Sequence, residues 1–347
     1  KQHSDLRRII MAAYISFQPT DFFNTKLYTG NASTNIISSI GFNPDMTWIK
    51  ERDGLNNHAL FDTVRGDDKH IEPNLTNAEA TESGALAFGT DKFTLGNWTT
   101  INGSGKLFAS WNWKAGTTSG LSGGTITPTA YSINTTSGFG IYKYTGNTTS
   151  GATIAHGLGV APKVVITKRI VNSSSAEWNS IWNVPGLAAT DFLRFTQVNK
   201  VTASWGYNDT FPDATNFTLG NNAQTNSSEG MIAYAFAPIK GYSKFSSYTG
   251  NGNADGTFVY TGFRPAFVMV HRFDSGSEDW NMWNNKALGY NIDNNKQYAN
   301  LTTVESTADE IDLLSNGFKW RTTNGGLNAS GGSYIYMAFA EFPFVSS

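Results

Sequence analysis

The sequence predicts an all-β protein built of three tandem β-sandwich modules of jelly-roll or concanavalin-like type, preceded by an N-terminal arm. Three observations lead to this prediction. Apolar residues alternate with a period of two in the candidate strands, and helical periodicity is almost absent. Clusters of Gly, Asn and Asp, such as Asp53-Gly54 and Asn251-Gly252, interrupt the chain at short intervals. An ordered series of landmarks occurs three times, roughly a hundred residues apart, which is the size of an independent domain.

Each copy of the repeat begins with the string Tyr-Thr-Gly-Asn and continues through the same landmarks. The string occupies Tyr28–Asn31, Tyr144–Asn147 and Tyr248–Asn251. A Gly-x-x-Pro segment follows in each copy, starting at Gly41, Gly159 and Gly262, and leads into an apolar run that ends in basic residues. These runs are rich in β-branched or bulky residues, which favours strands. Each copy closes on an aromatic strand, at Phe108–Trp113, Met231–Phe236 and Tyr334–Phe339.

The closing strands have one face of large side chains and, in the later copies, an opposite face of alanines. Because side chains alternate along a strand, the two faces point to opposite sides of a sheet. The large face carries Ala109, Trp111 and Trp113, then Ile232, Tyr234 and Phe236, then Ile335, Met337 and Phe339. This asymmetry predicts a strand inside a two-sheet sandwich.

The repeat boundaries predict modules at residues 26–116, 138–240 and 241–344. Residues 1–25 have no counterpart in the other copies, so we expect an arm that orders on a partner. Residues 117–137 are dense in Gly, Ser and Thr, and we expect a flexible or surface-hugging linker there. The short connection from Ala237 to Gly241 predicts that modules two and three pack together. Each module is long enough to bury its own core, so the array is expected to behave as beads.

Composition excludes several classes of function. The 347-residue chain has no cysteine, which excludes disulfides, thiolate metal sites and a cysteine nucleophile. Its net charge is -2 and only 15% of its residues are charged, so it has no basic field for nucleic acid. No apolar run approaches the 18 or so residues of a membrane span, which weighs against membrane insertion.

No catalytic or metal-binding pattern is present in the sequence. The five histidines occupy unrelated repeat positions apart from His271, which stands where the other copies have Lys50 and Lys168. Nucleotide-binding glycine runs and a nucleophile elbow are missing as well. The sequence therefore predicts that the chain is not an enzyme and uses no cofactor or metal.

A glycan site is the one binding site that the residues suggest. Tryptophan and asparagine pairs recur in the middle of modules two and three, and indole faces beside amide groups suit neutral sugars. The candidate residues are Trp178, Asn179, Trp182, Trp280, Asn281 and Trp283. The alternative is that these tryptophans fill the sandwich cores.

The repeat resembles a module found in structural proteins of marine tailed bacteriophages. The resemblance runs from about residue 26 to residue 343 and is carried by segments of the first and third copies. These are Gly41–Lys50, Phe61–Gly66, Phe93–Gly96, Tyr248–Asn251, Gly262–Val268 and Tyr334–Ala340. It implies a virion protein with a lectin-like β fold, and it brings no catalytic residues. The cysteine usual near the closing strand of such modules is replaced here by Asn112, Ala235 and Ala338.

Together these observations predict a non-enzymatic virion surface protein that is assembled in the host cytoplasm. The expected role is a tail appendage that contacts host-surface glycans. A decoration protein of the capsid is the alternative, and a polysaccharide depolymerase is a more remote one. Expected partners are other virion proteins and further copies of the chain, with a trimer favoured.

Overall fold

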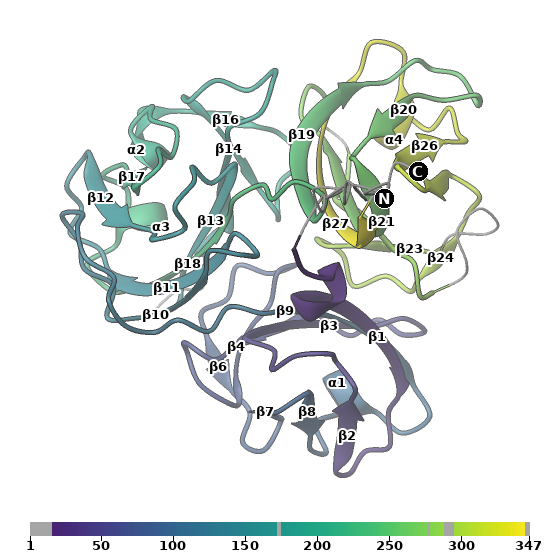
Figure 1. Ribbon diagram of the computed structural model, residues 1–347, viewed down its shortest axis with the longest axis horizontal. Coiled ribbons are helices and arrows are strands. Elements are labelled where there is room, and N and C mark those ends of the chain that lie inside the picture. The colour runs from purple at the N-terminus through teal and green to yellow at the C-terminus, as the bar shows by residue number, and fades with distance from the viewer. Residues whose placement is uncertain (1–15, 172–174, 277, 288–294, 344–347) are drawn as a thin grey trace, which may run out of the picture.

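The computed structural model describes residues 16–171, 175–276, 278–287 and 295–343. Over these residues the ordered structure consists of antiparallel β-sheets and helical turns of at most four residues (Figure 1). The predicted all-β class is confirmed. Residues 1–15, which make up most of the predicted N-terminal arm, lie outside the described residues.

Each repeat forms one large sheet, and six strands follow the same order in all three sheets. In the first repeat the order is β1 (Phe23–Thr29), β9 (Leu107–Trp113), β3 (Met46–Glu51), β4 (Ala59–Asp62), β5 (Lys69–Ile71) and β6 (Ala80–Thr81). In the second it is β11 (Phe139–Thr145), β18 (Gly230–Phe236), β13 (Val164–Arg169), β14 (Asn179–Trp182), β15 (Asp191–Arg194) and β16 (Val201–Thr202). In the third it is β19 (Ser243–Thr249), β27 (Ser333–Pro343), β21 (Phe263–Arg272), β22 (Asn281–Asn284), β23 (Asn295–Tyr298) and β24 (Ser306–Thr307).

A small sheet accompanies each large one. These sheets are β2 (Asn35–Ser38), β8 (Lys92–Leu95) and β7 (Leu86–Gly89); β12 (Ala152–Ala155) and β17 (Asn216–Leu219); and β20 (Phe258–Tyr260), β26 (Gly317–Trp320) and β25 (Ile311–Leu314). The helical turns are η1 (Pro19–Asp21), α1 (Thr99–Asn102), α2 (Ser204–Tyr207), α3 (Ala223–Asn226) and α4 (Gly325–Asn328). Large and small sheets share an apolar core in each repeat. In the first repeat, for example, Ile49 and Phe61 of the large sheet cluster with Phe93 of the small sheet.

The large faces of the three closing strands do not point into these cores. All nine residues of those faces belong to a fourth cluster, the central core, which lies where the three repeats meet. The alanines of the opposite faces, such as Ala233 and Ala338, point into the cores of the individual repeats. The predicted difference between the two faces is present. The small face packs inside its own repeat, and the large face contacts neighbouring repeats, which the prediction of a sandwich strand did not include.

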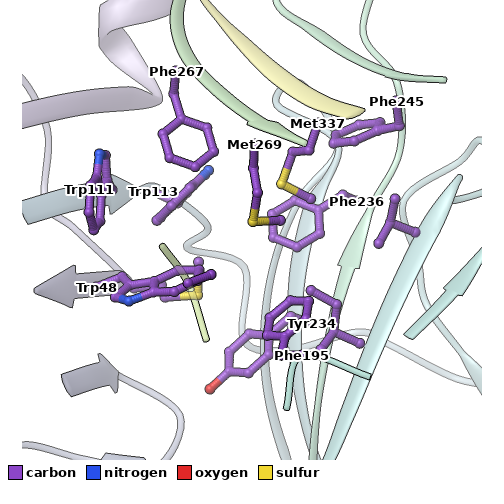
Figure 2. Close-up of a cluster of buried hydrophobic side chains, with 14 of the residues drawn as sticks. Trp48, Trp111, Trp113, Phe195, Tyr234, Phe236, Phe245, Phe267, Met269 and Met337 are labelled. Atoms are coloured by element: carbon purple, nitrogen blue, oxygen red, sulfur yellow. The ribbon is translucent and has the colours of Figure 1, made fainter. Parts of the chain in front are cut away.

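The central core unites the three repeats. Figure 2 shows Trp48 and Trp111 of the first repeat, Phe236 of the second, and Phe267 and Met269 of the third gathered around one space. A cavity of about 20 Å³ lies between Trp48, Phe236, Phe267 and Met269 and is lined only by apolar and aromatic residues. A space of this size without polar partners does not hold an ordered water. The prediction of independent beads is wrong, because each repeat buries one face of its large sheet against the other two.

The predicted linker at residues 117–137 is part of the second repeat. Residues Ala130–Asn134 form β10, which pairs with β11 and adds a seventh strand to the large sheet. Leu121 and Ile126 pack against the core of the same repeat. The Gly, Ser and Thr residues supply turns between these contacts, so their density does not mark a flexible tether.

The described end of the predicted arm is also built into the fold. Residues Phe23 to Thr25 begin β1, and Phe23 stacks on Phe339 of the third repeat with ring centroids 5.0 Å apart. Phe17 and Phe22 both contact the ring of Tyr242. Residues 16–25 therefore fasten the first repeat to the third, and only residues 1–15 are left for the attachment role.

The Tyr-Thr-Gly-Asn string has a structural role that is the same in all three repeats. The tyrosine hydroxyl donates to a carbonyl oxygen in a helical turn, from Tyr28 to Ile101, from Tyr144 to Thr225 and from Tyr248 to Leu327, at 2.6–2.7 Å. The residue after each of those carbonyls is a buried asparagine: Asn102, Asn226 and Asn328. Its Oδ1 accepts from the backbone N–H of the string's asparagine, and its Nδ2 donates to that asparagine's Oδ1.

The glycine of the string is required by this close approach. A Cβ on Gly30, Gly146 or Gly250 would lie 2.2–2.4 Å from the carbonyl oxygen that follows the buried asparagine. No real Cβ contact is that short, so any other residue would push the turn away.

We expect Asn226→Ala to lower the free energy of unfolding by about 2 kcal/mol, because it leaves the N–H of Asn147 and two carbonyl oxygens without their partner. Urea unfolding followed by tryptophan fluorescence measures the loss. The control is Asn221→Ala, at an exposed position of the preceding turn, which is expected to change stability by less than about 0.5 kcal/mol. Equal losses in the two variants would contradict the structural role of Asn226.

Candidate functional site

All six candidate glycan residues are buried. Trp178, Trp182, Trp280 and Trp283 are each at most 1% exposed, and Asn179 and Asn281 are at most 4% exposed. Stacking on a sugar needs an accessible ring face, so these side chains cannot form the proposed platform in this structure. The alternative reading, that the tryptophans fill cores, is the one that the burial supports.

Strand register shows which of the tryptophans truly correspond. Trp178 and Trp280 each directly precede the fourth strand of their repeat, β14 and β22, and His58 holds the same place before β4. Trp182 is the fourth residue of its strand and Trp283 is the third, so the two do not correspond. They therefore point to opposite sides of their sheets: Trp182 into the central core and Trp283 into the core of the third repeat.

The three corresponding rings connect the repeats. Trp178 Nε1 donates to the carbonyl oxygen of Glu72 in the first repeat at 3.0 Å. Trp280 Nε1 donates to that of Arg194 in the second repeat at 3.1 Å. His58 Nε2 lies 2.8 Å from the carbonyl oxygen of Tyr298 in the third repeat.

The proton on His58 is placed by a second contact. Trp48 Nε1 donates to His58 Nδ1 at 2.8 Å, so Nδ1 carries no proton and Nε2 is the donor to Tyr298. Arg194 and Tyr298 are the last residues of the fifth strands of their sheets, and Glu72 directly follows the fifth strand of the first sheet at the equivalent place. Within the described residues, the three bonds thus form a closed cycle in which each repeat donates to the next, which we call the inter-repeat ring.

Charged and polar contacts reinforce the ring where the first repeat meets the third and the second. Arg52 of the first repeat pairs with Glu305 of the third through two N–O contacts of 2.8 Å, and both side chains are largely buried. Between the first and second repeats, Tyr234 Oη donates to Asp62 Oδ2 at 2.7 Å, and Arg65 pairs with the same carboxylate at 2.5 Å. Removing one partner of such a buried pair destabilises the folded protein, because the remaining charge stays buried without its partner.

The position shared by Lys50, Lys168 and His271 lies directly beside the ring. All three residues are at most 1% exposed. Lys168 Nζ is 5.8 Å from the ring centroid of Trp178, and the His271 imidazole stacks on Trp280 at 4.4 Å. Desolvation lowers the pKa of Lys50 to about 8, that of Lys168 to about 7 and that of His271 to about 4.

His58 has the most strongly shifted pKa of the ring. Desolvation, and then the positive charge of Lys50, lower its pKa to about 3. At neutral pH the imidazole is therefore uncharged, which the acceptor role of Nδ1 also requires. The buried imidazole contacts the third repeat, whereas Lys50 and Lys168 donate to carbonyl oxygens of their own repeats.

The two asparagines of the candidate site have matching backbone roles. Asn179 Nδ2 donates to the carbonyl oxygen of Glu177 and Asn281 Nδ2 to that of Asp279, two residues earlier in each case. Both amides hold the bend that brings the chain into the fourth strand. Sequence reasoning found the recurrence of tryptophan and asparagine and aligned the segment from His58 to Phe61 with it, but took the first repeat to lack the feature. The strand register and the bond to Tyr298 show that His58 has the role of the tryptophans.

Among the described residues, no group of three or more His, Cys, Asp or Glu side chains is placed to hold a metal ion. In the same part of the chain, no helix has the length and apolar character to cross a membrane.

Comparison with known proteins adds a family and nothing on activity. No curated protein matches the chain, and no solved structure does. A family model described as "Domain of unknown function (DUF7483)" matches residues 18–343, which include all three repeats and the inter-repeat ring. The chain therefore belongs to the DUF7483 family.

Proposed function

We propose that this chain is a non-enzymatic structural protein of a bacteriophage particle surface, made of three tandem β-sandwich modules of jelly-roll or concanavalin-like type. The bacteriophage context comes from the sequence resemblance. The observation that supports a structural role is the inter-repeat ring with its central core. The residues that recur between repeats serve the turns, the ring and the core, so their recurrence is explained without a shared ligand.

We favour the capsid-decoration role over the tail appendage. The appendage role depended on an exposed indole in each of two repeats, and all four indoles are buried. A decoration protein needs a rigid body that binds coat subunits, and three repeats joined through one core supply such a body. The threefold arrangement that a trimer obtains by association is already present within one chain, so a single copy would present three related surfaces to its partners.

The test is to locate the chain on purified particles by electron cryo-microscopy and antibody labelling. The proposal expects many copies spread over the head at regular lattice positions. Few copies confined to the tail tip would favour the appendage role. Absence of the chain from purified particles would contradict a virion role altogether.

A second experiment examines the N-terminal segment. A chain lacking residues 1–15 retains β1 and the contacts of Phe17 and Phe22, so we expect it to fold with unchanged thermal stability. If residues 1–15 attach the chain to a partner, the truncated chain should fail to join the particle. Incorporation at normal occupancy would remove the attachment role.

A further inference from the structure

A surface hollow of about 370 Å³ lies in the third repeat, beside its connection to the second. Its volume is within the range of small-molecule sites. The connection, β19 and the end of β20 form its walls. The lining residues are Pro238, Lys240, Gly241, Ser243, Lys244, Tyr260, Thr261 and Gly262.

Tyr260 gives the hollow an accessible aromatic face. The side chain is 50% exposed, whereas its neighbour Val259 points into the core of the third repeat. Strand register places Ser38 of β2 and Ala155 of β12 at the same position as Tyr260. Two repeats thus form the same small-sheet pairing without an aromatic residue here, so the fold does not require the tyrosine.

Lys244 gives the hollow a cation beside the aromatic ring. Its Nζ lies 5.2 Å from the ring centroid of Tyr260 and donates to the Tyr260 carbonyl oxygen at 2.7 Å. Asn24 occupies the equivalent place in the first repeat and donates to the carbonyl oxygen of Ile40, two residues beyond Ser38, without any charge. A neutral side chain at this place can therefore make a backbone bond of this kind, and the charge of Lys244 is additional.

The electrostatic surroundings of the hollow favour an anion. Two lysines and no Asp or Glu are among its lining residues. Burial alone lowers the pKa of Lys244, with no carboxylate raising it in return. The hydroxyls of Ser243 and Thr261 are engaged in bonds to backbone groups, and Lys244 and Tyr260 are the residues that we assign to a ligand.

We propose that this hollow binds a saccharide that carries a carboxylate. The ring of Tyr260 stacks on the C–H face of one sugar, and the ammonium group of Lys244 pairs with its carboxylate. Aromatic stacking tolerates many sugars, and the charge of Lys244 selects those with a negative charge. The site is independent of where the chain sits in a particle, so its failure would leave the proposed structural role standing.

The experiment is a calorimetric titration of the whole chain with a galacturonic acid hexamer, compared with the fully methyl-esterified hexamer. The two probes have the same sugar rings and differ in charge. We expect the acid to bind at least tenfold more tightly than the ester, and the difference to shrink as salt is raised. Equal binding of both probes would contradict the role of Lys244, and binding of neither would overturn the site.

Variants at the hollow test whether the saccharide binds there. Tyr260→Ala and Lys244→Gln should each weaken acid binding at least tenfold, and glutamine retains a donor for the structural bond. The matched control is Ile36→Ala, which removes an exposed apolar side chain from β2, the equivalent strand of the first repeat, and should leave binding unchanged. Melting temperatures verify that each variant is folded. Unchanged affinity in a folded Lys244→Gln or Tyr260→Ala chain would overturn the proposal.

Discussion

Replacement of Trp280 by alanine is expected to lower the free energy of unfolding by roughly 3 to 5 kcal/mol. The indole is buried in the central core, stacks on His271 and donates to the Arg194 carbonyl oxygen, which would keep only the longer bond from the Gln197 N–H. The loss should affect the whole chain, because the same residue joins the third repeat to the second. Differential scanning calorimetry should show one transition, shifted to lower temperature.

The matched control is Trp205→Ala, which removes a partly buried indole from the second repeat, outside the central core. We expect a smaller loss there. Two separate transitions, in the wild-type chain or in Trp280→Ala, would show that the repeats unfold independently and would contradict the unifying role of the central core.

Acidification should destabilise the chain strongly between pH 7 and pH 4. The pKa of His58 is about 3 and that of His271 about 4, both below the ordinary value of 6.5. In the unfolded chain these imidazoles take up protons as the pH falls below 6.5, while the folded chain holds them neutral. Stability is therefore lost as the pH falls, by up to about 1.4 kcal/mol per pH unit for each group.

The lowered pKa values of Lys50 and Lys168 act in the same direction at higher pH, so stability should still rise between pH 7 and pH 8. The check is a series of urea unfolding curves from pH 8 to pH 4.5. His271→Phe keeps an aromatic ring against Trp280 without a titrating group. In this variant about one proton fewer should be taken up on unfolding in acid, so the free energy of unfolding should fall less steeply with pH. An unchanged pH dependence in this variant would show that His271 does not contribute.

The repeated sequence segments were enough to predict equivalent strands, but they did not show which part of the protein packs against each face of the sheets. The recurrence of Tyr-Thr-Gly-Asn and of the closing strands predicted equivalent strands, and the register pairs these positions in all three repeats. Alternation along Phe108–Trp113 shows that two faces differ, but it carries no information on whether the second face meets solvent, a small sheet or another repeat. The sequence likewise could not show whether Trp178 and Trp280 face solvent or another repeat, so a sugar-binding role was one possible interpretation.

Composition was also a weak guide to the connections. Residues 117–137 were interpreted as a linker because Gly, Ser and Thr dominate there. Within them, the segment that contains Tyr131 and Ile133 forms β10. The contact between His58 and Tyr298 joins residues 240 positions apart. No short-range signal encodes such a pair, since it depends on how whole sheets are placed against one another.

The inter-repeat ring has a consequence for how the protein can change over generations. In an assembly of three identical chains, every substitution appears three times around the axis, and each interface must tolerate it. In this chain a substitution appears once. The first repeat can therefore have His58 where the other two have tryptophans, and Trp48 supplies the hydrogen bond that the imidazole needs. Each repeat can therefore differ at a position where the other two keep their residues, and Tyr260, which stands where the other repeats have Ser38 and Ala155, is a difference of that kind.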